Sequence, residues 1–181
     1  MARSHQQRRS RLQEERIAED VGGRVQSGSG SSWSAKSDVR KMGDLRIEAK
    51  FTEKPEYTLK LDELLKLRDE AIKGGLETPI MQVEFAGPGF AGSYKLAVMD
   101  FALFHHWYGF SQNKGLHIQE CWTAAKQFRL DLPSARAFFA GATSLSALGV
   151  IRLVFERNDW KRHYAVIEWD LFTTLHEEYH P

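Results

Sequence analysis

Two carboxylates and a lysine lie close together in this sequence. Asp38 is followed, after nine intervening residues, by Glu48-Ala49-Lys50. A pair of carboxylates can hold Mg²⁺ or Mn²⁺, because hard divalent ions prefer oxygen ligands. Such an ion polarises a phosphate and lowers the pKa of a bound water, while a nearby lysine can stabilise the charge that develops on the phosphate oxygens. The spacing therefore favours metal-assisted hydrolysis of a phosphodiester.

A β-hairpin would bring these three groups together. Residues 45–51 alternate between apolar and polar side chains, which predicts a half-buried strand with Glu48 and Lys50 on its polar face. Residues 38–44 contain the end of the preceding strand and a turn in which Gly43 takes a positive φ. The hairpin sets Asp38 beside Glu48. A Glu-x-Lys on an exposed strand is also a common pattern of solvated charge, and this alternative stays open.

A helix is predicted upstream, over residues 12–21, and Gly22-Gly23 ends it. Glu14 lies on the same face as its apolar stripe, whereas Glu15 and Glu19 share a more exposed face. Glu14 is therefore the candidate for a third acidic group at the site. The alternative is a first-turn carboxylate that only favours the helix dipole.

A run rich in glycine and serine connects this helix to the hairpin. By composition residues 27–34 are a flexible linker. Their position suggests a second use, because glycine amides can approach a phosphate and a serine hydroxyl can bond to it. The candidate DNA-binding residues are Arg24, Ser27, Gly28, Lys36 and Lys60, with Ser29 the candidate catalytic serine.

Residues 11–104 resemble the PD-(D/E)xK nuclease superfamily, and most closely the small Holliday junction resolvases often met in bacteriophage genomes. The resemblance is carried by residues 13–18, 22–30, 38–40, 47–50 and 57–61. It implies a restriction-endonuclease-like core in which Asp38 and Glu48 are metal ligands and Lys50 is the catalytic lysine. It also implies an acidic residue on the first helix, matched by Glu14, and a serine in the glycine-serine run. The family usually has Pro or Gly before the aspartate, where this chain has Ser37.

The function that follows is a Mg²⁺- or Mn²⁺-dependent endodeoxyribonuclease acting on branched DNA such as Holliday junctions. A branched substrate with two strands to cut favours a homodimer with two sites. The alternative is a noncatalytic nucleic-acid-binding or assembly protein that uses the same scaffold.

The remaining pattern predicts an α/β fold with a small mixed sheet flanked by helices. Residues 59–72 are expected to form a helix with Leu61, Leu64, Leu65 and Ile72 inward. Strands follow over 80–85 and 94–99, and then a short helix over 100–108. The expected domains are a basic disordered arm (1–10), the nuclease domain (11–108) and a C-terminal module (109–181).

The C-terminal module is predicted to be α+β. Helices over 116–130 and 133–148, the second stopped by Gly149, precede a hairpin of residues 150–156 and 163–169. This is the order of a winged helix, which often binds DNA, although a partner-binding or dimer-forming module fits equally well.

Residues 96–104 and 164–172 also resemble each other, as a strand running into a helix. We attribute this to chance similarity of amphipathic segments. The alternative makes residues 105–163 an insertion.

Composition and charge agree with a globular, nucleic-acid-binding chain. The 181 residues carry a net charge of +1, but residues 1–60 hold 13 Lys/Arg and 9 Asp/Glu, a balance of +4. The basic start suits backbone contact with DNA, although a solubilising tail is nearly as good an explanation. A single cysteine and no membrane-length apolar run favour the reducing cytoplasm, of the host if the gene is phage-borne. The histidines show no His-x-x-His spacing, so no zinc site is expected.

Overall fold

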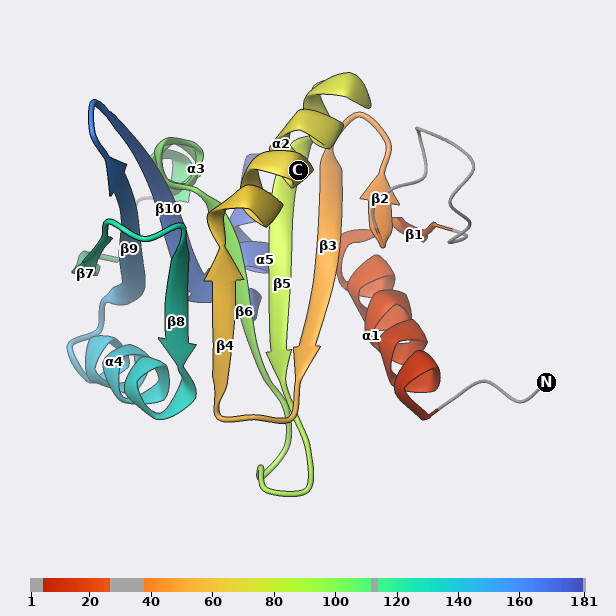
Figure 1. The fold of residues 1–181 in the computed structure, drawn as a ribbon, viewed down its shortest axis with the longest axis horizontal. Coiled ribbons are helices and arrows are strands. Elements are labelled where there is room, and N and C mark those ends of the chain that lie inside the picture. Colours follow the sequence, from red (N-terminus) through yellow and green to blue (C-terminus); the bar gives the residue numbers. More distant parts are fainter. Residues whose placement is uncertain (1–4, 27–37, 112–113, 181) are drawn as a thin grey trace.

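The computed structural model describes residues 5–26, 38–111 and 114–180. Its elements (Figure 1) are α1 (His5–Val21), β1 (Arg24–Val25), β2 (Val39–Lys41), β3 (Leu45–Thr52), β4 (Glu56–Lys60), α2 (Leu61–Lys73), β5 (Thr78–Phe85), β6 (Tyr94–Asp100), α3 (Phe101–Ser111), β7 (Leu116–Thr123), β8 (Gln127–Asp131), α4 (Leu132–Ser144), β9 (Leu148–Arg157), β10 (Trp160–Glu168) and α5 (Trp169–Tyr179). No described helix has the length and apolar character needed to span a bilayer.

One mixed sheet organises the chain. In the described residues its strand order is β1-β2-β3-β5-β6-β10-β9-β7, and β4 and β8 form a separate ribbon. β3 runs parallel to β5 and β7 parallel to β9, while the other neighbours in the sheet are antiparallel. The predicted α/β class with a mixed sheet is confirmed, and most strand pairs are antiparallel.

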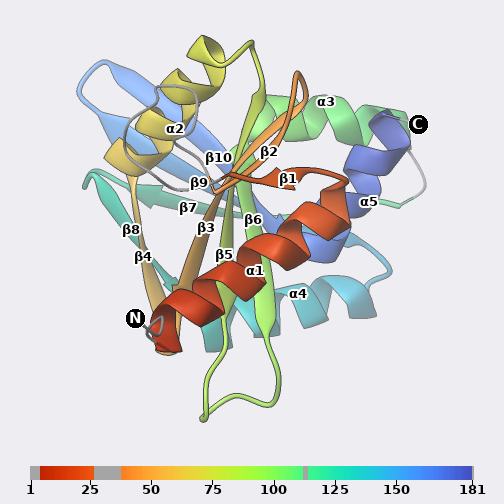
Figure 2. The ribbon, with the colours of Figure 1, turned by 90° about the vertical axis from the view of Figure 1, so that its right-hand side faces the viewer.

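Helices cover both faces of this sheet. α2, α4 and the β4–β8 ribbon pack on one face around Phe85, Phe155 and Val166. α1, α3 and α5 pack on the other face around Ile47, Trp107 and Phe172. Figure 2 shows the end of the sheet formed by β1, β2 and β3, with α1 crossing in front of it and α2 and α5 on opposite sides.

The fold contains an internal repeat. The order β3-β4-α2-β5-β6-α3 recurs as β7-β8-α4-β9-β10-α5, and the two units meet where β6 pairs with β10 and β4 with β8. In the sheet, β5 lies between β3 and β6 just as β9 lies between β7 and β10. The arrangement is a pseudo-twofold in which each unit supplies three strands of the sheet, and β1 and β2 extend the sheet beside β3.

The register follows the same pseudo-twofold. Val98 faces Val166 at the middle of the β6–β10 ladder. The Leu61 amide donates to the Lys126 carbonyl and the Leu132 amide to the Pro55 carbonyl, both at 2.8 Å. The likeness of residues 96–104 to 164–172 is therefore structural, because these segments are β6–α3 and β10–α5. The attribution to chance was wrong.

The predicted helix over residues 116–130 was also wrong. This segment forms β7 and β8, which belong to two different sheets. Without that helix the winged-helix order disappears. The boundary expected after residue 108 is crossed by the β6–β10 ladder and by both apolar cores, so the residues after it share one sheet with those before.

Gly149 does not stop a helix. It is the second residue of β9, and α4 ends earlier, at Ser144. A Cβ added at residue 149 would lie 2.7 Å from Phe139 Cδ1 and 3.1 Å from Ala142 Cβ. Glycine therefore lets α4 approach the sheet closely, which a pattern of helix-breaking residues does not reveal.

Smaller differences concern element ends. α1 begins at His5, so residues 5–10 are helical and not a disordered arm. Residues 59–60 end β4 and do not start a helix. α2 buries Leu61, Leu64, Leu67 and Ala71, whereas Ile72, expected inward, is 52% exposed. The predicted strands near residues 80–85 and 94–99 and the helix that follows them are confirmed.

Candidate metal-dependent active site

The predicted hairpin is present and sets Asp38 beside Glu48. β2 pairs antiparallel with β3, with Val39 opposite Ile47, and Gly43 in the turn has a φ of +73°. The residue before β2 thus lies opposite the residue after Ile47. Asp38 Oδ2 accepts a hydrogen bond from the Ala49 amide at 2.7 Å, which fixes the carboxylate against β3.

Lys50 is held between two carboxylates. Its Nζ lies 3.0 Å from Glu48 Oε1 and 3.9 Å from Glu63 Oε2, which α2 supplies. Burial alone lowers the pKa of Lys50, but the charge and hydrogen bond of Glu48 and the charge of Glu63 together raise it above its ordinary value. The ammonium therefore stays protonated at neutral pH and suits charge stabilisation better than proton abstraction.

Three carboxylates influence one another at this edge of the sheet. The pKa of Asp38 is raised to about 6 by burial and by the charge of Glu48, with a smaller contribution from Glu14. The pKa of Glu14 is also raised, chiefly by burial, although Arg11 opposes the shift. Negative charge is thus concentrated where β2 begins, and a divalent cation would relieve it.

Gln13 places Glu14 at this edge. Its side chain is 2% exposed, and Nε2 donates to the Lys50 carbonyl at 3.0 Å and to Gln82 Oε1 at 2.9 Å. One residue of α1 therefore bridges β3 and β5, and the next carries the acidic group. The choice of Glu14 over its exposed neighbours is supported by this contact.

A small cavity of about 150 Å³ lies against Glu48 and Lys50, and α2 closes it with Glu63, Lys66, Leu67 and Glu70. Tyr57 is close enough for Lys50, Glu63 and Glu48 to influence it, and burial is the main cause that raises its pKa to about 12. Sequence reasoning missed Glu63, Tyr57 and Gln13. No spacing rule links them to the hairpin, because the β4–α2 connection and the docking of α1 bring them there.

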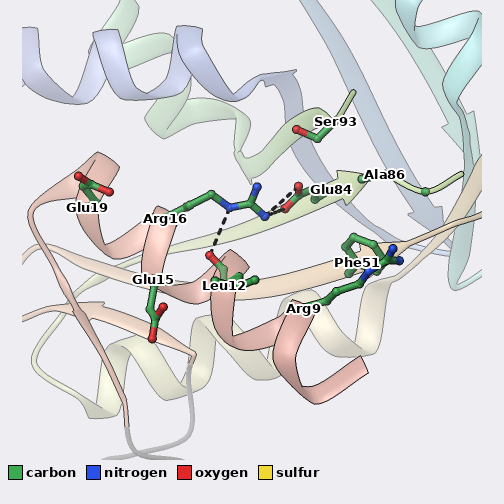
Figure 3. Close-up of a pocket in the computed structure, with 10 residues that line it drawn as sticks. Arg9, Leu12, Glu15, Arg16, Glu19, Phe51, Glu84, Ala86 and Ser93 are labelled. Carbon is green, nitrogen blue, oxygen red and sulfur yellow. Dashed lines mark hydrogen bonds and ion pairs between the residues drawn. The ribbon is translucent and has the colours of Figure 1, made fainter. Parts of the chain in front are cut away.

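A larger cavity, of about 570 Å³, lies elsewhere, between α1 and the ends of β3 and β5 (Figure 3). Arg16 crosses it, donating from Nη2 to both carboxylate oxygens of Glu84 at 3.1 Å and from Nε to the Leu12 carbonyl at 3.2 Å. Arg9 pairs with Glu53, and Arg11 pairs with Glu15. Arg9 and Arg16 tie α1 to the β3–β4 connection and to β5, whereas the Arg11–Glu15 pair lies within α1. These pairings weaken the assignment of the arginines to DNA.

The other predicted residues are only partly placed. Arg24 is exposed on β1, and Lys60 is exposed at the end of β4, 3.9 Å from Glu63. Ser27, Gly28, Ser29 and Lys36 lie outside the described residues. Gln26 and Asp38, the described residues on either side of them, are joined by a hydrogen bond from the Gln26 amide to the Asp38 carbonyl at 2.9 Å.

Arg46, two residues before Glu48 on β3, is not part of the site. It is 1% exposed, and its Nε donates to Glu77 Oε2 at 2.9 Å, while Arg40 Nε donates to the other Glu77 oxygen at 2.6 Å. This buried ion cluster fastens the hairpin to the start of β5.

The second unit of the repeat does not carry the same groups. The fourth and sixth residues of β3 are Glu48 and Lys50, and those of β7 are Gln119 and Cys121. No described strand pairs with the outer edge of β7, whereas β2 covers that edge of β3. Among the described residues the acidic site is therefore confined to the first unit. No protein-family model matches this chain, and no curated protein sequence matches it.

Proposed function

We propose that this chain is a Mg²⁺- or Mn²⁺-dependent endodeoxyribonuclease that cuts branched DNA, with a restriction-endonuclease-like core in its first unit. The observation that carries the proposal is the carboxylate pair of Asp38 and Glu48 beside Lys50. The negative charge of Glu48 opposes ionisation of Asp38, and Lys50 stays protonated. The connection from β3 through α2 to the parallel strand β5 also supports such a core.

The donor set fits a hard divalent ion. All three candidate ligands, Asp38, Glu48 and Glu14, offer carboxylate oxygens, which Mg²⁺ and Mn²⁺ prefer. Among the described residues these three are not a set whose ligand atoms all lie within 4.8 Å of one another. Mg²⁺ typically keeps several waters and uses only one or two carboxylates, so Asp38 and Glu48 would be the direct ligands.

Each residue then has a defined task. The bound ion would polarise the scissile phosphate and lower the pKa of an attacking water. Asp38, fixed by the Ala49 amide, and Glu48 hold the ion. Lys50 donates to the phosphate oxygens as their charge builds up, and Glu63 orients its ammonium. Glu14 adds negative charge at the ion, and the basic residues Arg24 and Lys60 contact the DNA backbone.

The repeat bears on the oligomeric state. Because the second unit has Gln119 and Cys121 at the matching positions, the described part of one chain offers one such acidic site. Cutting two strands of a junction therefore calls for two chains, and we propose a homodimer on this ground.

The test is cleavage of a labelled four-way junction, a linear duplex and a flap in Mg²⁺, with wild type and Glu48→Ala. We expect junction cleavage that the substitution abolishes. Equal cleavage of all three DNAs would keep the nuclease and discard the junction preference. Binding without cleavage in either Mg²⁺ or Mn²⁺ would contradict the nuclease and favour a noncatalytic nucleic-acid-binding or assembly protein.

A further inference from the structure

Three nitrogen and oxygen ligands converge at the opposite end of the hairpin from the acidic site. Asp44 lies in the β2–β3 turn, and His176 and His180 lie one turn apart at the end of α5. His176 Nε2 lies 2.9 Å from Asp44 Oδ2, and His180 Nε2 lies 3.6 Å from Asp44 Oδ1. One ligand atom from each of the three residues lies within 4.8 Å of the others. Among the described residues, this is the group of three His, Cys, Asp or Glu side chains that meets this distance.

We propose that Asp44, His176 and His180 form a second metal site, specific for Zn²⁺ or a similar transition-metal ion. Two imidazoles and one carboxylate are borderline ligands that suit such ions better than Mg²⁺. Bonds of about 2.0–2.1 Å in a tetrahedron keep ligand atoms roughly 3.4 Å apart. The two histidine nitrogens lie 2.9 and 3.6 Å from different oxygens of the Asp44 carboxylate, on either side of this value. Small side-chain rotations that direct both nitrogens and one oxygen at a shared ion would complete the site.

The surroundings are those of a partly closed site. His176 is 3% exposed, and Asp44 Oδ1 is buried and accepts no hydrogen bond from the described residues. His180 is more open, with 39% of its side chain exposed, which leaves a fourth position for water.

The backbone at both ends of the cluster is already ordered. The Asp44 carbonyl accepts from the Thr78 amide at 2.7 Å, and its amide donates to the Lys41 carbonyl at 3.0 Å. Trp107 packs against both histidines, with ring centroids 5.7 Å from His176 and 5.9 Å from His180. A bound ion would therefore fasten α5 to the hairpin that carries Asp38 and Glu48.

One group competes for the carboxylate. Lys41 Nζ lies 3.0 Å from Asp44 Oδ2, and its side chain is 35% exposed, so it can swing away when an ion binds. If the cluster is only an ion-pair network, Lys41 belongs to it. If the cluster is a metal site, the ammonium opposes the ion. The variant Lys41→Met separates these cases, because removing the ammonium takes a partner from an ion-pair network but removes a competitor from a metal site.

The experiment is titration of tag-free, full-length protein with Zn²⁺ and with Co²⁺ in millimolar Mg²⁺, which occupies oxygen sites. Calorimetry gives the stoichiometry and affinity, and the visible spectrum of Co²⁺ reports its ligands. Quenching of Trp107 fluorescence by the bound ion, which should be absent in Trp107→Phe, places the ion beside His176 and His180. We expect one ion per chain, binding weakened at least roughly tenfold in His180→Ala, and equal or tighter binding in Lys41→Met.

Two control variants separate this site from the proposed catalytic one. Glu48→Ala and the exposed His105→Ala should leave the Zn²⁺ affinity unchanged, whereas Glu48→Ala should abolish cleavage. His180→Ala should keep the unfolding temperature of the metal-free protein, because this side chain is exposed at a helix end. No saturable binding by wild type, or equal binding by His180→Ala, would overturn the second site while leaving the nuclease proposal standing.

Discussion

Glu48 and Gln119 occupy the same position in two strands that the internal pseudo-twofold relates. Each is the fourth residue of an eight-residue strand, and each strand runs parallel to the strand that follows its helix. One scaffold is thus present twice in the chain, with the acidic group in the first unit and an amide in the second. Variants of Glu48 and Lys50 therefore have matched controls at Gln119 and Cys121.

Asp38→Asn should stabilise the metal-free protein at alkaline pH. The pKa of Asp38 is raised to about 6 from an ordinary 3.8, so the folded state binds this proton more tightly than the unfolded state. In wild type, protonated Asp38 therefore stabilises the fold. This contribution is fully present below pH 3.8 and is lost as the pH rises through about 6. We expect the variant to be about 2 kcal/mol more stable than wild type at pH 8 and similar to it below pH 4.

Urea unfolding in EDTA at the two pH values measures this difference. Added Mg²⁺ should stabilise wild type at pH 8 and leave Asp38→Asn unchanged, because only a protein with its ligands gains from the ion. A variant less stable than wild type at pH 8 in EDTA would show that the carboxylate charge is well compensated, and would contradict the proposed ion site.

Lys50→Met should slow cleavage by roughly 10²–10³-fold, as loss of one group that stabilises transition-state charge does. Mn²⁺ binding should be kept or become tighter, because the ammonium 3.0 Å from Glu48 is removed. Single-turnover rates and Mn²⁺ titration provide the two readouts. Cys121→Ala, at the related position, should match wild type in both. Cleavage by Lys50→Met at the wild-type rate would remove the lysine from the mechanism.

Glu77→Gln should lower the free energy of unfolding by about 3–5 kcal/mol, because it leaves the buried charge of Arg46 without its partner. Glu156→Gln breaks the exposed Lys161 pair, at 3.1 Å, and should cost less than about 1 kcal/mol. Denaturant unfolding compares them. Similar small losses in both would mean that water reaches the Arg46 guanidinium, contrary to its 1% exposure.

Gly149→Ala should destabilise the fold by about 1–3 kcal/mol, because the new methyl group would press into α4 at Phe139. The control is Gly141→Ala in α4, where an added Cβ meets nothing within 4 Å. That change should stabilise by up to about 1 kcal/mol, since alanine favours a helix. Thermal unfolding distinguishes opposite signs, and a neutral Gly149→Ala would show that α4 can shift at little cost.

Local patterns predicted the hairpin of the site well. Alternation over residues 45–51 and Gly43 in the turn are properties of adjacent residues, and they determine that Asp38 faces Glu48. Gly22 ends α1 with a φ of +65°, as the pair of glycines indicated. Glu63 and Tyr57 could not be found in this way, because only the packing of β4 and α2 brings them to Lys50.

The second unit was harder to predict because its pattern misleads. Ile118, Cys121 and Trp122 have helical spacing, yet β7 is a strand, with Ile118 and Trp122 42% and 50% exposed. Its pairing with β9, some thirty residues later, determines the structure. Two clues were present in the sequence. The likeness of residues 96–104 to 164–172 marked the repeat, and the spacing of His176 and His180 by four residues marked one helix face.

The nuclease proposal is tested most directly by single-turnover cleavage of a labelled four-way junction in Mg²⁺, comparing wild type, Glu48→Gln and Gln119→Ala. Glu48→Gln keeps the shape of the side chain and removes the ligand charge, while Gln119→Ala makes an exposed change at the related position. We predict cleavage by wild type and Gln119→Ala at the same rate, and none by Glu48→Gln. Equal cleavage by all three proteins, or by none of them, would contradict a metal-dependent active site at Glu48.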